Sequence, residues 1–304
     1  MADSNPVIKV LKAGDSTKPD PFTIAIIANP ALEAPWNTGQ FVLDPITFDP
    51  KAFDAAAQYI CDVLFGRLAN QGEQFLADPA IAPKIRVVSL FVEDLNAEDA
   101  NSLAAQDTDS NLLIARRTVF SPFLQRYGLE ADVAYAVSES TKHTRASAWY
   151  TSDDDARGGV PFQLDGVSLF HRYYCRIPGT VAIHANATSM TALHEFGHAL
   201  SSYSNGMVVD LYVDSGPALN CKTGRPIPPK FAIYDTAQNA SDPKRDSLGY
   251  PSGWKSYHCE MIDPGFPALM DDYWQAPDHI PEHSRHDRIT RQFLSDRVRA
   301  KIAR

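Results

Sequence analysis

The sequence predicts an α/β fold in which a twisted mixed sheet packs on a central helix and a loop-rich lower lobe ends in a C-terminal helix. Two continuous apolar runs, residues 22–28 and 85–92, have the length and composition of buried strands. A third run, residues 181–185, leads directly into a segment of helical periodicity at 189–200. The last helix is expected at 285–303, where apolar residues recur on one side.

The N-terminal part of the chain predicts a strand, a linker and a capped helix. Residues 7–11 are expected to form a short strand, and residues 12–20 a polar linker. Asp49 is placed to cap a helix that has Pro50 in its first turn. Apolar residues then recur at helical spacing, which predicts a helix to about residue 68: Phe53, Ala57, Ile60, Val63 and Leu64.

The middle of the chain gives weaker signals. Residues 93–110 are polar and acidic, which predicts a surface loop with a short helix, whereas residues 112–120 and 131–137 fit either strands or short helices. The Asp-Gly pair at 165–166 separates two short apolar runs and predicts a β-hairpin. Residues 236–265 are expected to be mostly loop.

Composition indicates an ordinary globular chain. Its 304 residues, 44% hydrophobic and 21% charged, are enough to bury a sizeable core. A net charge of -9 argues against nucleic acid and anionic membranes as partners. We see no secretory signal and no membrane-spanning run, so a cytoplasmic location is the default expectation and a leaderless export route stays open.

A single domain is expected over residues 1–304, with a strand and linker at 1–21, an upper lobe at 22–206 and a lower lobe at 207–304. The four cysteines are scattered and form no Cys-x-x-Cys pair, which argues against a zinc ribbon or a dense disulfide framework. A bridge between Cys221 and Cys259, and the oligomeric state, stay open.

The most specific chemistry lies in the predicted helix 189–200, which contains His194-Glu195-Phe196-Gly197-His198. Residues four apart lie one turn apart on a helix, so His194 and His198 point the same way and can hold one Zn²⁺. Glu195 lies beside them and can take a proton from water whose pKa the zinc lowers to about 7. The pattern therefore predicts one zinc per chain, with two histidine ligands and Glu195 as the general base.

The third zinc ligand is harder to place. A catalytic zinc usually takes three protein ligands, and the extended metzincin pattern would supply a histidine six residues after the second one. That place is Ser204, and the glycine expected three residues after His198 is Ser201. Asn205-Gly206 favours the end of the helix, because glycine can adopt the left-handed conformation that turns the chain.

The chain resembles the bacterial immunoglobulin A metallopeptidase family, a group of metzincin-type zinc peptidases. His-Glu-x-Gly-His at 194–198 matches the first part of the family motif, and Asp210-Leu211-Tyr212 resembles the Asp-Glu-Tyr that follows it. The resemblance runs from about residue 22 to residue 273. It implies a metzincin-like fold, a peptide or protein substrate, and Asp210 as the third zinc ligand.

Alternatives to Asp210 stay open, because the gap after His198 is longer than in the family and Leu211 stands where the family has glutamate. Asp214 and His258 are the other candidate ligands. His258 could instead stabilise the substrate oxyanion.

The resemblance also implies a Met-turn, in which a methionine beneath the zinc site supports the histidines. Met270 is favoured, because residues 268–270 resemble the Ala-Leu-Met turn of matrix metallopeptidases, and Met261 is the alternative. Tyr273, which follows Met270 closely, could donate a hydrogen bond to the substrate oxyanion.

Other histidines have less specific surroundings. His184 is expected to be a strand residue at the edge of the cleft. A loose cluster near the last helix could hold a second metal, although a solvated start of that helix is the expected state: His279, Glu282, His283, His286 and Asp287.

Together these observations predict a zinc-dependent peptidase in which Glu195 activates the attacking water. Two other classes stay open, namely a metal-binding protein without hydrolytic turnover and a zinc hydrolase that acts on a non-peptide amide. Glu195 favours an enzyme, because zinc retention alone does not need that glutamate. The substrate and its cleavage site stay unspecified.

Overall fold

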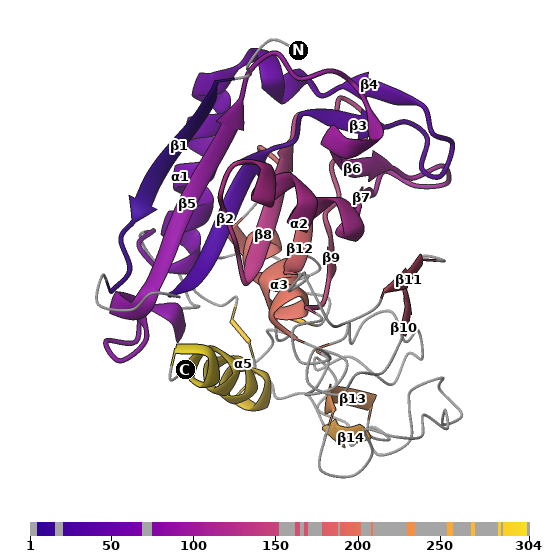
Figure 1. The fold of residues 1–304 in the computed structure, drawn as a ribbon. Coiled ribbons are helices and arrows are strands. Elements are labelled where there is room, and N and C mark those ends of the chain that lie inside the picture. Colours follow the sequence, from indigo (N-terminus) through magenta and orange to yellow (C-terminus); the bar gives the residue numbers. More distant parts are fainter. Residues whose placement is uncertain are drawn as a thin grey trace.

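The architecture is α/β, as predicted, with two mixed β-sheets and helices packed against them (Figure 1). A computed structural model describes these parts of the chain: residues 5–15, 21–68, 75–151, 162–164, 167–169, 178–187, 189–201, 208, 230–234, 254–257, 269–270, 285–286 and 288–302. The division into lobes at residue 206 stays a prediction, because most residues after 208 lie outside these ranges.

The larger sheet has six strands in the order β1-β5-β2-β8-β12-β9. The inner four strands are parallel, and the two edge strands, β1 and β9, are antiparallel to their neighbours. Both faces of the sheet are covered at its centre, where every residue of β2 is buried. The bounds are β1 Pro6–Lys12, β2 Phe22–Ala28, β5 Ile85–Val92, β8 Val133–Ser138, β9 Ser147–Trp149 and β12 Gly179–His184.

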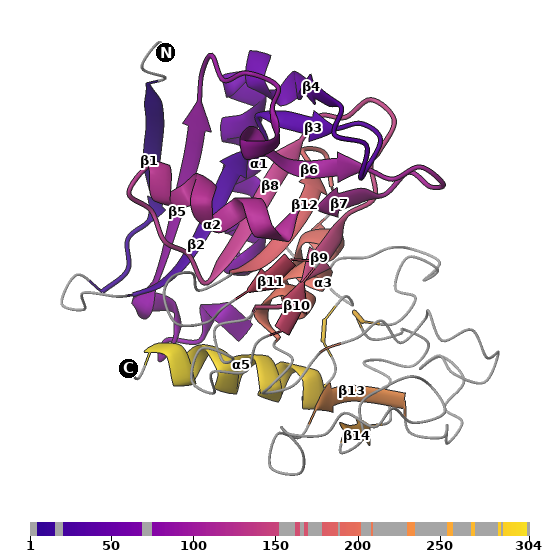
Figure 2. The same ribbon diagram turned by 45° about the vertical axis from the view of Figure 1, so that its right-hand side comes forward.

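The smaller sheet has four strands in the order β4-β3-β6-β7, and Figure 2 shows it beside the larger sheet. Its strands are β3 Ala31–Glu33, β4 Phe41–Leu43, β6 Ser102–Gln106 and β7 Leu113–Ala115. The predicted surface loop at 93–110 is therefore wrong in part, since β6 is a largely buried strand that pairs with β3 and β7.

The helices divide between the two faces of the larger sheet. Helices α1 Pro50–Leu64, α3 Ser189–Leu200 and α5 Arg288–Ile302 share one apolar core with Ile24 and Ile26 of β2. Helix α2 Arg117–Arg126 and the smaller sheet share the other core with Ala25 and Ile27. Short 3-10 helices connect these elements at Pro45–Phe48, Phe75–Ala77, Ala82–Lys84 and Asp99–Asn101.

Helix α1 begins as predicted and ends earlier than predicted. The Asp49 side chain accepts hydrogen bonds from the backbone N–H groups of Lys51 and Ala52, and Pro50 occupies the first turn. The helix ends at Leu64 and not near residue 68, because Gly66 adopts a left-handed conformation with φ 61° that turns the chain away.

The remaining strands form two hairpins. Strands β10 Phe162–Leu164 and β11 Val167–Leu169 pair antiparallel, which confirms the hairpin predicted around Asp165-Gly166. Strands β13 Lys230–Tyr234 and β14 Trp254–Tyr257 also pair antiparallel, so part of the predicted loop at 236–265 is a strand.

The predicted C-terminal helix is confirmed as α5, although it begins at Arg288, three residues later than predicted. Its buried side chains Leu294, Val298 and Ile302 recur at helical spacing and join the core that contains α3. No helix in the described parts of the chain is long and apolar enough to cross a membrane.

Candidate functional site

Helix α3 carries the predicted site and is held inside the domain. It follows β12 directly and packs against β12, β9 and α1. Its apolar side chains are almost completely buried, which agrees with the helical periodicity of residues 189–200: Met190, Ala192, Leu193, Phe196, Ala199 and Leu200. A helix packed on several sides has little freedom to rotate, so the direction of its polar side chains is fixed by the core.

The C-terminal turn of α3 lies in direct contact with the backbone of β12 at Gly179. A Cβ atom added to Gly179 would lie 1.8 Å from the carbonyl oxygen of Ala199, far inside contact distance. Only glycine permits this approach, because any side chain would overlap a backbone atom that cannot move alone. Gly179 therefore sets the distance between the sheet and the end of α3, next to His198.

His194 and His198 come together on α3 as the sequence predicts. Their Nε2 atoms lie 3.2 Å apart, and the two rings are nearly perpendicular, with centroids 4.8 Å apart. His194 is 3% exposed, and His198 is partly buried. The two side chains therefore direct one nitrogen each at a shared point.

Backbone carbonyl groups fix the tautomer of both histidines. Nδ1 of His194 lies 2.7 Å from the carbonyl oxygen of Leu269, and Nδ1 of His198 lies 2.8 Å from that of Val208. A carbonyl oxygen can only accept, so both Nδ1 atoms must carry the proton. Each neutral ring then presents the lone pair of its Nε2 atom, which is the form that binds a metal.

The spacing of the two Nε2 atoms fits a zinc ion. Two nitrogens bound to a tetrahedral zinc at about 2.0–2.1 Å lie roughly 3.3–3.4 Å apart, and the Nε2 atoms are 3.2 Å apart. Two lone pairs that face each other at this distance repel unless a proton or a metal cation lies between them. Imidazole nitrogens are also among the ligands that zinc prefers.

Glu195 lies on the same helix and is buried, with 7% exposure. Beneath α3, the hydroxyl of Tyr135 in β8 donates a hydrogen bond of 3.0 Å to the carbonyl oxygen of Ala192. Burial raises the pKa of Tyr135 well above its usual range, and the negative charge of Glu195 raises it further. The Tyr135 phenol therefore stays neutral and can keep donating to the helix that carries Glu195.

A turn at Leu269 and Met270 lies under α3. Met270 is 1% exposed, and a Cβ atom added to Gly197 would lie 3.2 Å from its sulfur. The thioether thus packs against the backbone of α3 between the two histidines, while the neighbouring Leu269 carbonyl orients His194. Met261, the alternative, lies outside the described residues, and the assignment of Met270 as the Met-turn stays a prediction.

The third ligand also stays a prediction. Asp210, Asp214 and His258 lie outside the described residues, as do Tyr273 and the Cys221–Cys259 pair. Among the residues that the structure describes, no group of three or more His, Cys, Asp or Glu side chains could hold a metal ion. The described part of the site therefore consists of the two histidines and Glu195.

Two other histidines differ in how well they match expectation. His184 ends β12 as a partly buried strand residue, and its Nδ1 accepts a hydrogen bond of 3.1 Å from the backbone of Asn186. The expectation of a solvated helix start is wrong for His286, which is 2% exposed. Its neighbour Arg285 accepts a hydrogen bond from Leu269, and this bond draws the chain inward beneath α3.

Four supporting residues were not expected from the sequence. Leu269 and Val208 act through backbone carbonyls, which leave no signal in residue type. His286 is surrounded by charged residues in the sequence, which suggested a solvated position. Tyr135 could have been noticed, because a phenol within an apolar strand needs a hydrogen-bond partner when it is buried.

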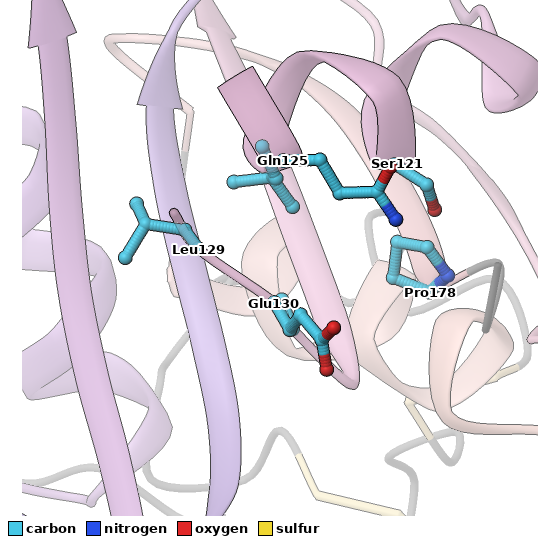
Figure 3. Close-up of a pocket in the computed structure, with 7 residues that line it drawn as sticks. Ser121, Gln125, Leu129, Glu130 and Pro178 are labelled. Carbon is cyan, nitrogen blue, oxygen red and sulfur yellow. The ribbon is translucent and has the colours of Figure 1, made fainter. Parts of the chain in front are cut away.

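A small pocket lies on the opposite face of the sheet (Figure 3). It is formed by the end of α2, the loop that leads into β8, and Pro178: Ser121, Leu124, Gln125, Leu129, Glu130, Ala131 and Pro178. Glu130 is its one ionisable side chain, so the pocket lacks the grouped donors that a metal requires. It lies on the α2 side, whereas the histidines lie on α3.

Comparison with protein-family models finds no match to this chain, and comparison with curated proteins finds no similar sequence. The resemblance to the immunoglobulin A metallopeptidase family therefore stays a prediction that depends on the motif itself.

Proposed function

We propose that the protein is a zinc-dependent peptidase that hydrolyses peptide bonds with Glu195 as general base. One observation carries the proposal: the Nε2 atoms of His194 and His198 converge to 3.2 Å, with both Nδ1 protons held by backbone carbonyls, beside the buried Glu195. This arrangement prepares both rings for one cation. The carboxylate of Glu195, next in sequence to His194, is not needed to retain a metal, and its presence therefore favours an enzyme.

We also propose a metzincin-type arrangement of the fold. Support comes from the mixed sheet whose parallel strand β12 runs directly into the metal-binding helix, and from Met270 packed beneath that helix.

His194 and His198 would hold the zinc, and a third ligand from 210, 214 or 258 would complete the set. Zinc, when bound, acts as a Lewis acid that lowers the pKa of water and polarises a carbonyl group. Glu195 accepts a proton from the water that attacks the peptide carbonyl carbon. As the carbon–nitrogen bond breaks, Glu195 delivers that proton to the departing amine nitrogen.

The supporting residues keep this geometry without taking part in the chemistry. The Leu269 and Val208 carbonyls hold the Nδ1 protons, so the rings cannot change tautomer or turn away. The Tyr135 hydroxyl anchors the first turns of α3 to β8.

The decisive experiment compares Glu195→Gln with the wild type. Glu195→Gln should keep about one zinc per chain by elemental analysis and lose turnover by several orders of magnitude on peptides found by mass spectrometry of a broad library. Glu130→Gln, an exposed carboxylate on the opposite face, is the matched control and should leave both unchanged.

Three results would contradict the proposal at different points. If the double variant His194→Ala, His198→Ala still bound zinc, these histidines would not be the zinc ligands. Equal turnover of Glu195→Gln and the wild type would show that Glu195 is not the general base. A wild type that holds zinc but cleaves no peptide would favour a non-peptide amide or a metal-binding role without turnover.

A further inference from the structure

His286 lies against the helix that carries the candidate ligands. It precedes α5 and is 2% exposed, so its imidazole belongs to the interior. A Cβ atom added to Gly197 would lie 3.0 Å from Nε2 of His286 and 3.2 Å from the sulfur of Met270. The His286 ring and the Met270 thioether therefore both pack against the α3 backbone at Gly197, three residues after His194 and one before His198.

The segment before His286 is also hydrogen-bonded to the turn that orients His194. The N–H of Leu269 donates to the carbonyl oxygen of Arg285 at 2.9 Å, and the carbonyl oxygen of Leu269 accepts from Nδ1 of His194 at 2.7 Å. Both hydrogen bonds are made by the backbone of one residue, Leu269, which they hold between Arg285 and His194. A displacement of residues 285–286 would thus be passed on to the His194 ring.

Glycine at 197 is what makes this contact possible. A methyl group at 197 would be tighter against both neighbours than ordinary contacts allow, so His286 or Met270 would have to move by a few tenths of an ångström. Such shifts matter at a metal site, where ligand distances are set within about 0.2 Å. The Gly197–His286 contact therefore lies close enough to the pair to affect its geometry.

We propose that His286 is a positioning residue for the metal-binding pair: its imidazole bears on Gly197 and, with Met270, holds α3 so that His194 and His198 keep their separation. The inference rests on the proposed function for the identity of the pair as zinc ligands. His286 acts through α3 and does not bind the metal. It extends the site to the start of the C-terminal helix.

The test measures Zn²⁺ affinity by competition with a fluorescent chelator, in the full chain, for His286→Ala, Gly197→Ala and the double variant. Each single variant should bind zinc about 10–100-fold more weakly, as is usual when an outer support of a metal ligand is removed. The double variant should bind no more weakly than the weaker single variant, because the methyl group at 197 then enters the space that the imidazole has left.

Two further measurements separate positioning from general loss of stability. Ile302→Ala removes a buried side chain at the far end of α5 and should lower the melting temperature without weakening zinc binding. Co²⁺ bound in place of zinc should give an altered visible absorption spectrum in His286→Ala and an unaltered one in Ile302→Ala. His286→Gln, which keeps a polar group of similar reach, should recover part of the affinity.

The outcomes distinguish this inference from the proposed function. Wild-type protein that binds no zinc would overturn both. Zinc bound by the wild type and equally tightly by His286→Ala would overturn the inference alone. Losses that multiply in the double variant, or an equal loss in Ile302→Ala, would also overturn it, since they would show that the Gly197–His286 contact has no specific effect.

Discussion

Gly179→Ala tests the close approach between β12 and α3 most directly. The added methyl carbon would lie 1.8 Å from the carbonyl oxygen of Ala199 and 2.4 Å from its carbonyl carbon. Real contacts of a Cβ atom are essentially never below 3.0 Å, so the two backbones must separate by at least about 1.2 Å. The obstacle is backbone, so the whole last turn of α3 has to move.

The magnitude follows from that displacement. Overpacking of a well-packed core costs about 1–3 kcal/mol. Because the clash is with backbone, we expect Gly179→Ala to lower the free energy of unfolding by about 3 kcal/mol. In a chain of 304 residues, this change corresponds to a melting temperature lower by about 5 °C. His198 is next to Ala199 and would move with it, so zinc affinity should fall by at least about 10-fold.

Thermal unfolding by circular dichroism and zinc competition are the two assays, and Gly39→Ala is the control. Position 39 also favours glycine, because its φ is 67°. However, nothing lies within 4 Å of a Cβ atom added there. Gly39→Ala should cost about 1 kcal/mol from backbone strain alone and leave zinc binding intact. Equal melting temperatures and zinc affinities for the two variants would refute the reasoning.

Two predictions concern the rest of the core. Lys301→Met should destabilise the fold by about 3–5 kcal/mol in urea denaturation, because Lys301 and Asp132 form a buried ion pair of 2.9 Å with side chains only 8% and 3% exposed. Lys9→Met, which breaks the exposed pair with Asp54, should cost less than about 1 kcal/mol, and similar losses for both variants would contradict this difference. Burial raises the pKa of the Cys61 thiol to about 11, so alkylation of Cys61 in the folded protein should be slow at pH 8 and rise only as the pH approaches 11. Peptide mass spectrometry checks this result, and labelling at the rate of the denatured chain would contradict it.

The elements that the sequence predicts well have strong local patterns. The strand Phe22–Ala28 is a continuous apolar run, and α1 has a capping aspartate followed by proline. Helix α3 combines apolar residues at helical spacing with a motif whose two histidines point the same way only on a helix. In these places local propensity and tertiary packing agree.

The elements that the sequence misses depend on distant partners. Strand β6 contains Ala104 and Ala105, which have weak strand propensity, and it follows an acidic stretch. Its burial comes from pairing with β3 and β7, which no local pattern indicates. The supports of the histidines are similar, because a backbone carbonyl becomes specific only when the fold brings it to a side chain.

The Leu269–His194 hydrogen bond has a consequence for synthesis on the ribosome. Domains begin to fold from their N-terminal side while the chain is still being made. The carbonyl that orients His194 lies 75 residues further along the chain, and Lys301, which docks α5 on Asp132, lies 169 residues after its partner. His194 therefore leaves the ribosome long before the carbonyl group that orients it. A nascent chain therefore carries the motif without the oriented pair until translation has passed Leu269.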